Sequence, residues 1–312
     1  MVLLEKLSNS NFEKFRELSL ERISVENYDK DFFEYYEKEK FFFKIFFKKF
    51  VKLFVYNGEI IGYIWYEVPV EIPIRIWSLY VKEEYLECLD ESILKSFNNT
   101  ILTYETQDDK TNNIMLKNLG FKKVNPSVLM NIKVNSFSKQ YYIDKLFSSI
   151  ENDISILEKF IYFTNEKYDN LVITTEIMKK NEEEQLRCDI QNSVFFNEDR
   201  SPLQLEDIEN DIKQDYYIDD LSMFVKINNI AIGYGQVIYN RGMYTVVNFG
   251  IINEFRGYGF GKILLCSLIK ACKEMDILDL YIRVEENNIS ALKLYSWIGF
   301  SPKLIINKWE RK

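Results

Sequence analysis

The chain has 312 residues, of which 47% are hydrophobic and 28% charged, a composition that supports a packed core and excludes a globally disordered chain. It contains no histidine, which excludes Ser-His-Asp and Cys-His catalysis and histidine-ligated metals, and we expect no metal site. The formal net charge of −8 lies mainly in residues 151–312, which argues against nucleic acid as a partner and favours a cationic acceptor such as an amine.

The sequence also carries signals about its cellular compartment. It has no run of eighteen apolar residues and no basic, apolar leader, so we expect neither a membrane span nor a secretory signal. The four cysteines are scattered, and Cys266 and Cys272 fall in an apolar helical pattern typical of core thiols. These features predict a cytoplasmic protein.

The first half of the chain predicts a mixed unit of strands and helices. Asn57-Gly58 stands between two alternating apolar runs, which is a strong hairpin signal. Gly120 ends a short helical pattern and is a suitable helix terminus. The expected helices are 12–22, 32–50, a short region beginning at 92–97, and 112–118; the expected strands are 3–8, 51–56, 60–68, 74–81, 101–105 and 128–134.

Residues 32–50 are dense in Phe and Lys. An amphipathic helix at a membrane surface has this kind of composition. We favour a helix that packs onto the sheet of its own domain with the lysines outward, because apolar stripes at helical spacing usually face a core.

The second half repeats the order of the first. Between the halves, residues 140–165 predict a mostly helical connector. The expected strands are 171–177, 221–227, 230–239, 244–252, 278–284 and 304–310, and the expected helices are 181–192, 205–212, one ending near 275, and 289–297, with a turn at 240–242.

An internal repeat supports two domains of one kind. Leu119-Gly120-Phe121 matches Ile298-Gly299-Phe300, each after a short helix and before a last strand. We therefore predict an α/β (α+β) protein with two domains, each a mixed, mostly antiparallel sheet flanked by helices. The predicted division is 1–139, a connector at 140–165, and 166–312.

The most informative stretch is 250–265, GIINEFRGYGFGKILL, which reads as a strand end, a tight turn and a helix start. Arg256, Gly259 and Gly261 form R-x-x-G-x-G, and Gly257 adds a third glycine. Glycines let backbone N–H groups approach a ligand closely, and the start of a helix adds unpaired N–H groups and a positive dipole end. The stretch therefore predicts an anion site suited to phosphate.

Other glycine motifs fit less well. A nucleotide P-loop requires Ser or Thr after Gly-Lys, but Ile263 follows Gly261-Lys262. A dinucleotide fingerprint, G-x-G-x-x-G, has Lys262 or Leu264 where its third glycine belongs. A strand-to-helix turn without any ligand is the remaining alternative.

A second motif follows about thirty residues later. Residues 288–300 form N-x-x-A-x-x-L-Y-x-x-x-G-F, from Asn288 to Phe300, with Tyr295 at its centre. Together with R-x-x-G-x-G, this pattern resembles the GNAT superfamily of acyl-CoA N-acyltransferases over about 245–300.

That resemblance implies acetyl-CoA as the cofactor and assigns residues to it. Ile251 would pair with the pantetheine arm through its backbone, Asn288 would touch the cofactor, and Tyr295 would lie by its sulfur. The backbone around the turn would bind the pyrophosphate, through Arg256, Gly257, Tyr258, Gly259, Phe260, Gly261 and Lys262.

By the same resemblance, a neutral amine would attack the thioester directly in a ternary complex, without an acyl-enzyme. The strand at Gly250 and Ile251 would offer an N–H to the oxyanion, and Tyr295 would protonate the departing thiolate. Many relatives place a carboxylate near Thr245 or Asn248, both neutral here; Asn248 could orient a water molecule or hold the acceptor. Other polar candidates for the base, which the sequence does not rank, are Glu176, Asp219, Asp220, Tyr234 and Glu285.

The first half keeps the frame without this chemistry. Alignment of the halves puts Leu86, Leu89 and Glu91 opposite Arg256, Gly259 and Gly261, and it puts Asp109 and Leu116 opposite Asn288 and Tyr295. A side chain at Leu89 blocks a close turn, and Glu91 would repel a phosphate. We predict that 1–139 is a degenerate GNAT-like domain and that 166–312 binds acyl-CoA; tandem chains with one active half are known in the superfamily.

The predicted function is an N-acetyltransferase that transfers an acetyl group from acetyl-CoA to a primary amine, either a small molecule or an amino group of a peptide or protein. The alternative is a non-catalytic acyl-CoA-binding sensor or interaction module. An oligomer is possible in either case.

Overall fold

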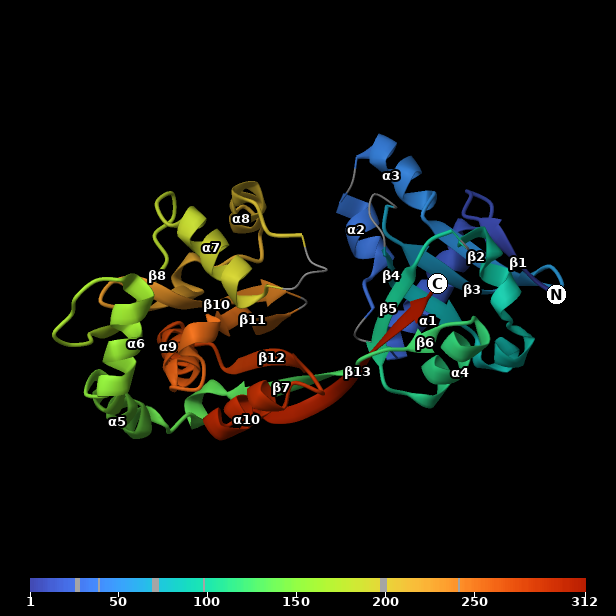
Figure 1. Ribbon diagram of the computed structural model, residues 1–312. Helices are drawn as coiled ribbons and strands as arrows, with labels where there is room; N and C mark the ends of the chain where they lie inside the picture. Colours follow the sequence, from blue (N-terminus) through green and yellow to red (C-terminus); the bar gives the residue numbers. More distant parts are fainter. Residues whose placement is uncertain (26–28, 39, 69–72, 98, 197–200, 241) are drawn as a thin grey trace. The chain divides into compact units, whose positions relative to one another are not determined.

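The structure is a computed structural model that describes residues 1–25, 29–38, 40–68, 73–97, 99–196, 201–240 and 242–312 (Figure 1). The chain folds into two compact units. Unit 1 comprises Met1–Val128, Glu285–Asn287 and Leu304–Lys312, and unit 2 comprises Leu129–Val284 and Asn288–Lys303. Arg241 of the predicted turn lies outside the described residues.

Unit 1 is a mixed sheet with flanking helices, as expected. Its strands lie in the order β1-β2-β3-β4-β5-β13, and all of these neighbours are antiparallel except β4 and β5, which are parallel. Its elements are β1 (Val2–Lys6), α1 (Phe12–Val25), α2 (Phe32–Lys38), α3 (Phe41–Lys48), β2 (Val51–Tyr56), β3 (Glu59–Tyr66), β4 (Ile74–Val81), the 3₁₀ segments η1 (Glu83–Cys88) and η2 (Glu91–Phe97), β5 (Leu102–Gln107), α4 (Lys110–Asn118), β6 (Lys122–Lys123) and β13 (Ser301–Arg311) from Leu304 onward.

The Phe- and Lys-rich segment differs from the single helix expected over 32–50. It forms α2 and α3, and α3 does not turn its lysines outward. Phe43, Ile45 and Phe46 are exposed by 56%, 52% and 41%, while the ammonium groups of Lys44 and Lys48 lie over aromatic rings of unit 1. None of the helices in the described part of the chain combines the length and apolar character that a membrane crossing needs.

Unit 2 has the same plan. Its strands lie in the order β7-β12-β11-β10-β9-β8, with β11 and β12 parallel and β11-β10-β9-β8 antiparallel. Its elements are β7 (Ser127–Lys133) from Leu129 onward, η3 (Val134–Ser136), α5 (Gln140–Glu151), α6 (Ile154–Thr164), β8 (Ile173–Ile177), α7 (Glu184–Val194), α8 (Leu205–Ile212), η4 (Asp219–Leu221), β9 (Ser222–Ile227), β10 (Ile230–Asn240), β11 (Met243–Ile251), η5 (Asn253–Phe255), α9 (Phe260–Glu274), β12 (Asp279–Glu285) and α10 (Ile289–Ile298).

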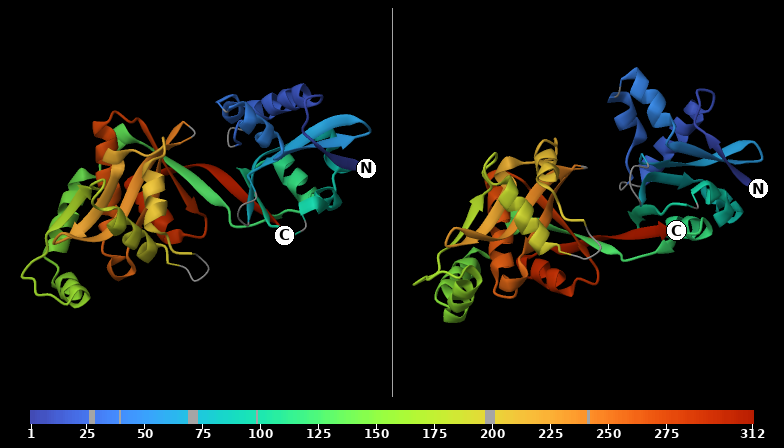
Figure 2. Two further views of the ribbon diagram at one scale, coloured as in Figure 1. Left: turned by 90° about the horizontal axis from the view of Figure 1, so that it is seen from above. Right: turned by 45° about the horizontal axis from the view of Figure 1, so that its top comes forward.

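Helices cover both faces of the sheet of unit 2. The end of α7 packs against Gly250 of β11, and α9 packs its leucines against Gly235 of β10, which faces the other way (Figures 1 and 2). The connector is helical, as predicted, and its helices α5 and α6 belong to unit 2.

Each unit contains a strand from the other half of the sequence. In β13, Ile306–Arg311 pairs antiparallel with β5, and Trp309 is buried in the core of unit 1. In unit 2, β7 lies beside β12: the Val134 N–H donates to the Leu278 carbonyl at 2.9 Å, and Lys133 forms an ion pair with Asp279. The division into functional domains at 140–165 stays a prediction. The two compact units are divided elsewhere, since unit 2 begins at Leu129 and unit 1 includes Leu304–Lys312.

This exchange makes a prediction about stability. Trp309→Ala removes a large side chain from the core of unit 1 and should lower the free energy of unfolding by about 3–5 kcal/mol. Hydrogen exchange should become faster in β2 and β3. The matched control Ile282→Ala, in β12, should instead accelerate exchange in β9 and β10 of unit 2. Faster hydrogen exchange in β9 and β10 of the Trp309 variant would contradict the assignment of the end of β13 to the core of unit 1.

Candidate functional site

The central feature of unit 2 is a gap between two parallel strands. β11 pairs with β12 at three positions, from Tyr244 opposite Leu280 to Val246 opposite Ile282. β11 then continues to Ile251, but none of its further described residues pairs with β12. One edge of β11 is therefore free of strand partners over its last five residues.

A β-bulge lies where the two strands separate. Tyr234 of β10 lies opposite Gly250, but Gln236 lies opposite Val247, so β11 contains one extra residue. Asn248, in the bulge, has a φ of +51°, a left-handed conformation that Asn tolerates better than most residues. A bulge bends its strand and increases the local twist, which explains why β11 leaves β12 at this point.

The ladder between β10 and β11 decides which backbone groups face the gap. The Ile252 N–H donates to the Ile232 carbonyl at 2.9 Å. Antiparallel pairs alternate between bonded and non-bonded, so Gly250 is bonded to Tyr234, while the backbone groups of Ile251 point away from β10. The Ile251 carbonyl oxygen accepts a hydrogen bond from Nε of Arg256, with the two atoms 2.7 Å apart. The Ile251 N–H remains directed into the gap.

The predicted anion turn follows directly. Gly257 and Gly259 have φ values of +89° and +101°, and α9 begins at Phe260. The Arg256 N–H donates to the Asn253 carbonyl and the Lys262 N–H to the Gly259 carbonyl. Within the described residues, no protein atom accepts the N–H groups of Gly257–Gly261. The turn thus presents a run of unused donors at the positive end of a helix.

Arg256 is hydrogen-bonded within the protein. Its N–H is used within the protein, and its guanidinium bonds two carbonyls, those of Ile251 at 2.7 Å and Val194 at 2.8 Å. The side chain therefore ties the end of β11 to the end of α7 and fixes the turn in place.

The connector packs against this turn. The methyl groups of Leu146, on α5, would lie 3.0 Å from a Cβ added at Gly259. On α6, Phe163 contacts Phe255 with ring centres 5.2 Å apart, and Lys159 lies 5.2 Å from the ring centre of Tyr258. Gly259 is consequently required by its conformation and by Leu146, independently of any ligand.

Tyr295 is 7% exposed on the inner face of α10. Its ring lies 6.2 Å from the rings of Phe249 and Phe300. Burial raises the pKa of Tyr295 to about 12, so the phenol is neutral at physiological pH. It is a potential proton or hydrogen-bond donor and cannot serve as a base.

The other predicted cofactor residues have structural tasks as well. Asn288 caps α10, because its Oδ1 accepts the Ala291 N–H at 3.1 Å. The side chain of Phe260 is buried, so only its backbone can meet a ligand. The ammonium group of Lys262 lies 4.2 Å from the ring centre of Trp297.

The five candidate bases are poorly suited to that task. Glu176 forms an ion pair with Lys226 at 2.8 Å, and this hydrogen bond lowers the pKa of Glu176. Asp219 pairs with Lys180, and Asp220 is exposed. Burial raises the pKa of Tyr234 well above its ordinary value, and its hydroxyl donates to Gln236 at 2.6 Å. The remaining candidate, Glu285, is grouped with unit 1.

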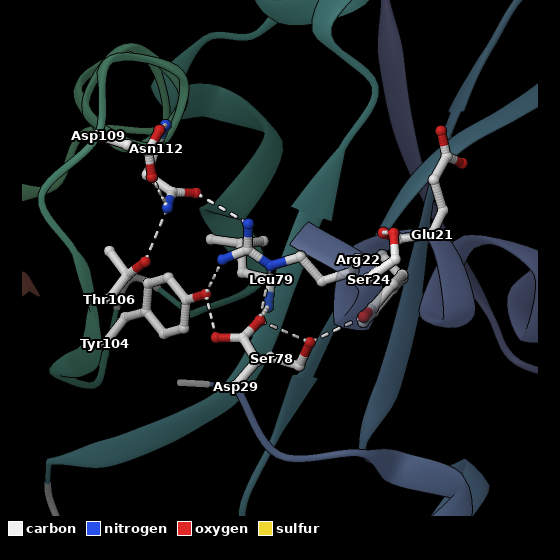
Figure 3. Close-up of polar contacts among 11 residues, drawn as sticks. Glu21, Arg22, Ser24, Asp29, Ser78, Leu79, Tyr104, Thr106, Asp109 and Asn112 are labelled. Atoms are coloured by element: carbon white, nitrogen blue, oxygen red, sulfur yellow. Dashed lines mark hydrogen bonds and ion pairs between the residues drawn. The ribbon is translucent and has the colours of Figure 1, made fainter. Parts of the chain in front are cut away.

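Unit 1 has a corresponding separation of strands, but its own side chains fill it. β4 pairs with β5 only at Ile74 and Arg75. Beyond these positions, Asp29 accepts hydrogen bonds from Arg22 at 2.9 Å, Ser78 at 2.8 Å and Tyr104 at 2.6 Å (Figure 3). The buried guanidinium of Arg22 also reaches Asn112 on α4 (Figure 3).

The stretch of unit 1 that aligns with the glycine turn contains no glycine. The matching stretch forms η1 and η2, and Leu86 and Leu89 are buried in the hydrophobic core. The sequence signalled this loss through Leu89 and Glu91. It gave no signal for the Arg22–Asp29 network, since those two residues and their partners are scattered over ninety positions.

The bulge leads to a stability prediction. Asn248→Ala should lower the free energy of unfolding by about 1–2 kcal/mol because Ala resists positive φ, whereas Asn248→Gly should not. Denaturant unfolding measures both. Asn229, which has a φ of +69° in the β9–β10 turn, provides the matched Ala and Gly pair. Equal stability of Asn248→Ala and Asn248→Gly would contradict the positive φ at this position. Because the Gly variant keeps the backbone conformation and lacks the side-chain amide, its turnover shows whether the amide contributes to the reaction.

Comparisons with known proteins concern the same part of the chain. The sequence model of the Acetyltransferase (GNAT) family matches residues 186–300. A [ribosomal protein bS18]-alanine N-acetyltransferase from Haemophilus influenzae is 40% identical over 76 residues, 24% of this chain. The match spans 50% of the length of that relative.

Solved structures share the fold at low identity. A GCN5-related N-acetyltransferase from Sphaerobacter thermophilus has a TM-score of 0.64 at 12% identity, covering 99% of this chain and 95% of that one. A tandem GNAT protein from the clavulanic acid biosynthesis pathway has a TM-score of 0.57 at 10% identity, covering 99% and 98%. Residues 186–300 therefore match the acetyltransferase (GNAT) family, in a chain that has the fold of tandem GNAT proteins.

Proposed function

We propose that the protein is an N-acetyltransferase that transfers the acetyl group of acetyl-CoA to a primary amine by direct attack in a ternary complex. The observation that carries this proposal is the run of unused N–H groups at Gly257–Gly261, beside the free edge of β11. The Haemophilus relative, by its name, acts on an alanine amino group, which agrees with an amine as acceptor.

The residues present fit coenzyme A. Its pyrophosphate would accept hydrogen bonds from the N–H groups of Gly257–Gly261, where the dipole of α9 adds to the attraction. Its pantetheine arm would lie along the free edge of β11, which would bring the thioester carbonyl to the Ile251 N–H. When bound, acetyl-CoA supplies an activated thioester to the site.

Two groups of the chain would assist the transfer. The Ile251 N–H, directed into the gap, would stabilise negative charge that develops on the carbonyl oxygen. Tyr295 would donate to the sulfur. Its pKa of about 12 exceeds the ordinary thiol value of ~8.5, so complete transfer of its proton is uphill and a hydrogen bond that strengthens with the charge is favoured.

The chain supplies no well-placed base among the candidates considered. We propose that the amine reacts from its neutral form, that the proton it loses passes through water to the departing thiolate, and that Asn248 orients that water molecule or the acceptor. Such a reaction needs no ionisable group at the bulge.

The surface around α7 and α8 favours a cationic acceptor. Glu206, Asp207 and Glu209 are exposed on α8, and α7 packs against β11 at Gly250. Negative potential on this face of unit 2 would attract an ammonium group and raise its local concentration.

The runner-up function is a sensor that binds acyl-CoA without turnover. The neutral side chains at Thr245 and Asn248 favour it. Release of free CoA from acetyl-CoA in the presence of a panel of amines and basic peptides distinguishes the two, because a sensor shows affinity without release.

Cofactor binding is tested by a matched pair of glycine variants. Gly257 and Gly242 have φ values of +89° and +71°, and nothing lies within 4 Å of a Cβ added at either. Both alanine variants therefore carry similar backbone strain, but only Gly257→Ala places a methyl group in the glycine turn before α9. Calorimetry should show a loss of CoA affinity of about tenfold or more for Gly257→Ala, and wild-type affinity for Gly242→Ala. Equal affinities would contradict binding at the turn.

Tyr295 is tested by substitution and by pH. Tyr295→Phe should reduce kcat by about 10² while leaving CoA affinity within twofold. Because the active form is protonated, activity should be lost as pH rises through about 12 rather than through 10, the ordinary tyrosine value. Unchanged turnover in the Phe variant would exclude the role, and an ultraviolet difference titration of the two proteins would check the pKa.

A further inference from the structure

Two lysines share one indole ring beside the glycine turn. The ammonium nitrogen of Lys262 lies 4.2 Å from the ring centre of Trp297, and that of Lys139 lies 5.5 Å from it. Lys262 stands in the first turn of α9, Trp297 on α10, and Lys139 directly before α5. Three elements of unit 2 thus bring two positive charges to one aromatic side chain.

These charges lack the partners that lysines usually find in so acidic a protein. Among the described residues, no carboxylate lies within ion-pair distance of Lys139 or Lys262. The ring attracts each ammonium group, which offsets part of their mutual repulsion. An anion bound between the two ammonium groups would offset the rest of their repulsion. The cluster is therefore suited to a multiply charged anion.

The position of the cluster indicates which anion. Lys262 follows Gly259 by three residues, about 4.5 Å along a helix axis, so the cluster lies within reach of a ligand bound at the turn. Coenzyme A carries two kinds of phosphate: the pyrophosphate, and a separate monoester on its ribose. A phosphate monoester carries about −1.5 to −2 charges at neutral pH, more than the lysines can find in a single carboxylate.

We propose that Lys139 and Lys262, held on Trp297, bind the ribose 3′-phosphate of coenzyme A while the turn binds the pyrophosphate. This inference rests on the proposed function and extends it to donor selectivity. The site would select free acyl-CoA over dephospho-CoA and over a pantetheine phosphate attached to a carrier protein. It also brings Lys139, the residue directly before the connector, into contact with the ligand.

The experiment compares two ligands that differ in that one phosphate. Calorimetry measures CoA and dephospho-CoA binding to the wild type, Lys139→Met, Lys262→Met and the double variant, all in the full chain. Methionine keeps the apolar stem on the ring and removes the charge. Lys270→Met, an exposed lysine later on α9, is the matched control.

We expect the wild type to prefer CoA by tenfold or more, with a preference that falls as salt rises. Each single variant should lose part of the preference and the double variant nearly all of it, while affinity for dephospho-CoA stays within twofold. Equal affinity of the wild type for both ligands would overturn the inference and leave the proposed function standing. Equal loss of both ligands in the variants would also overturn it, since it would show a structural role. Failure of the wild type to bind either ligand would overturn the proposed function itself.

Discussion

A single extra residue in β11 sets the geometry on which the candidate site depends. The bulge at Asn248 bends the strand away from β12 after three paired positions, and parallel strands that separate leave backbone groups without partners. A buried N–H without an acceptor costs free energy, so such an edge is stable only where solvent or a ligand can reach it. The Ile251 N–H lies at this edge, the amides of Gly257–Gly261 follow it in the chain, and Arg256 ties the end of β11 to the end of α7.

The two units show how one frame can be opened or closed. In both, the central pair of parallel strands is bonded only at its beginning. In unit 1 the space beyond is occupied by the Arg22–Asp29 ion pair, in which Asp29 also accepts from Ser78 and Tyr104. A buried charged pair of this kind needs each partner to be satisfied, and the network supplies those hydrogen bonds. Unit 1 thus closes with its own polar groups the space that unit 2 leaves open.

The connector is part of unit 2 in a physical sense. Leu146 packs against Gly259, Phe163 contacts Phe255, and Lys139, directly before the connector, lies 5.5 Å from the ring centre of Trp297. A glycine turn standing alone is flexible, because glycine restricts the backbone least. Packing from α5 and α6 restricts it from one side and Arg256 from the other, which prepares its N–H groups for a ligand without conformational adjustment.

The sequence alone determined the features that depend on neighbouring residues. Glycine spacing predicted the turn and the start of α9, hydrophobic periodicity predicted most strands and helices, and the motifs at 256–261 and 288–300 predicted the match of residues 186–300 to the GNAT family. Only the tertiary structure decided which strand completes which core, because strand pairing depends on edges far away in the sequence. It also decided that Arg256 binds carbonyls and that Leu146 limits Gly259. The Arg256–Val194 and Leu146–Gly259 contacts join residues sixty or more positions apart, and no local pattern encodes them.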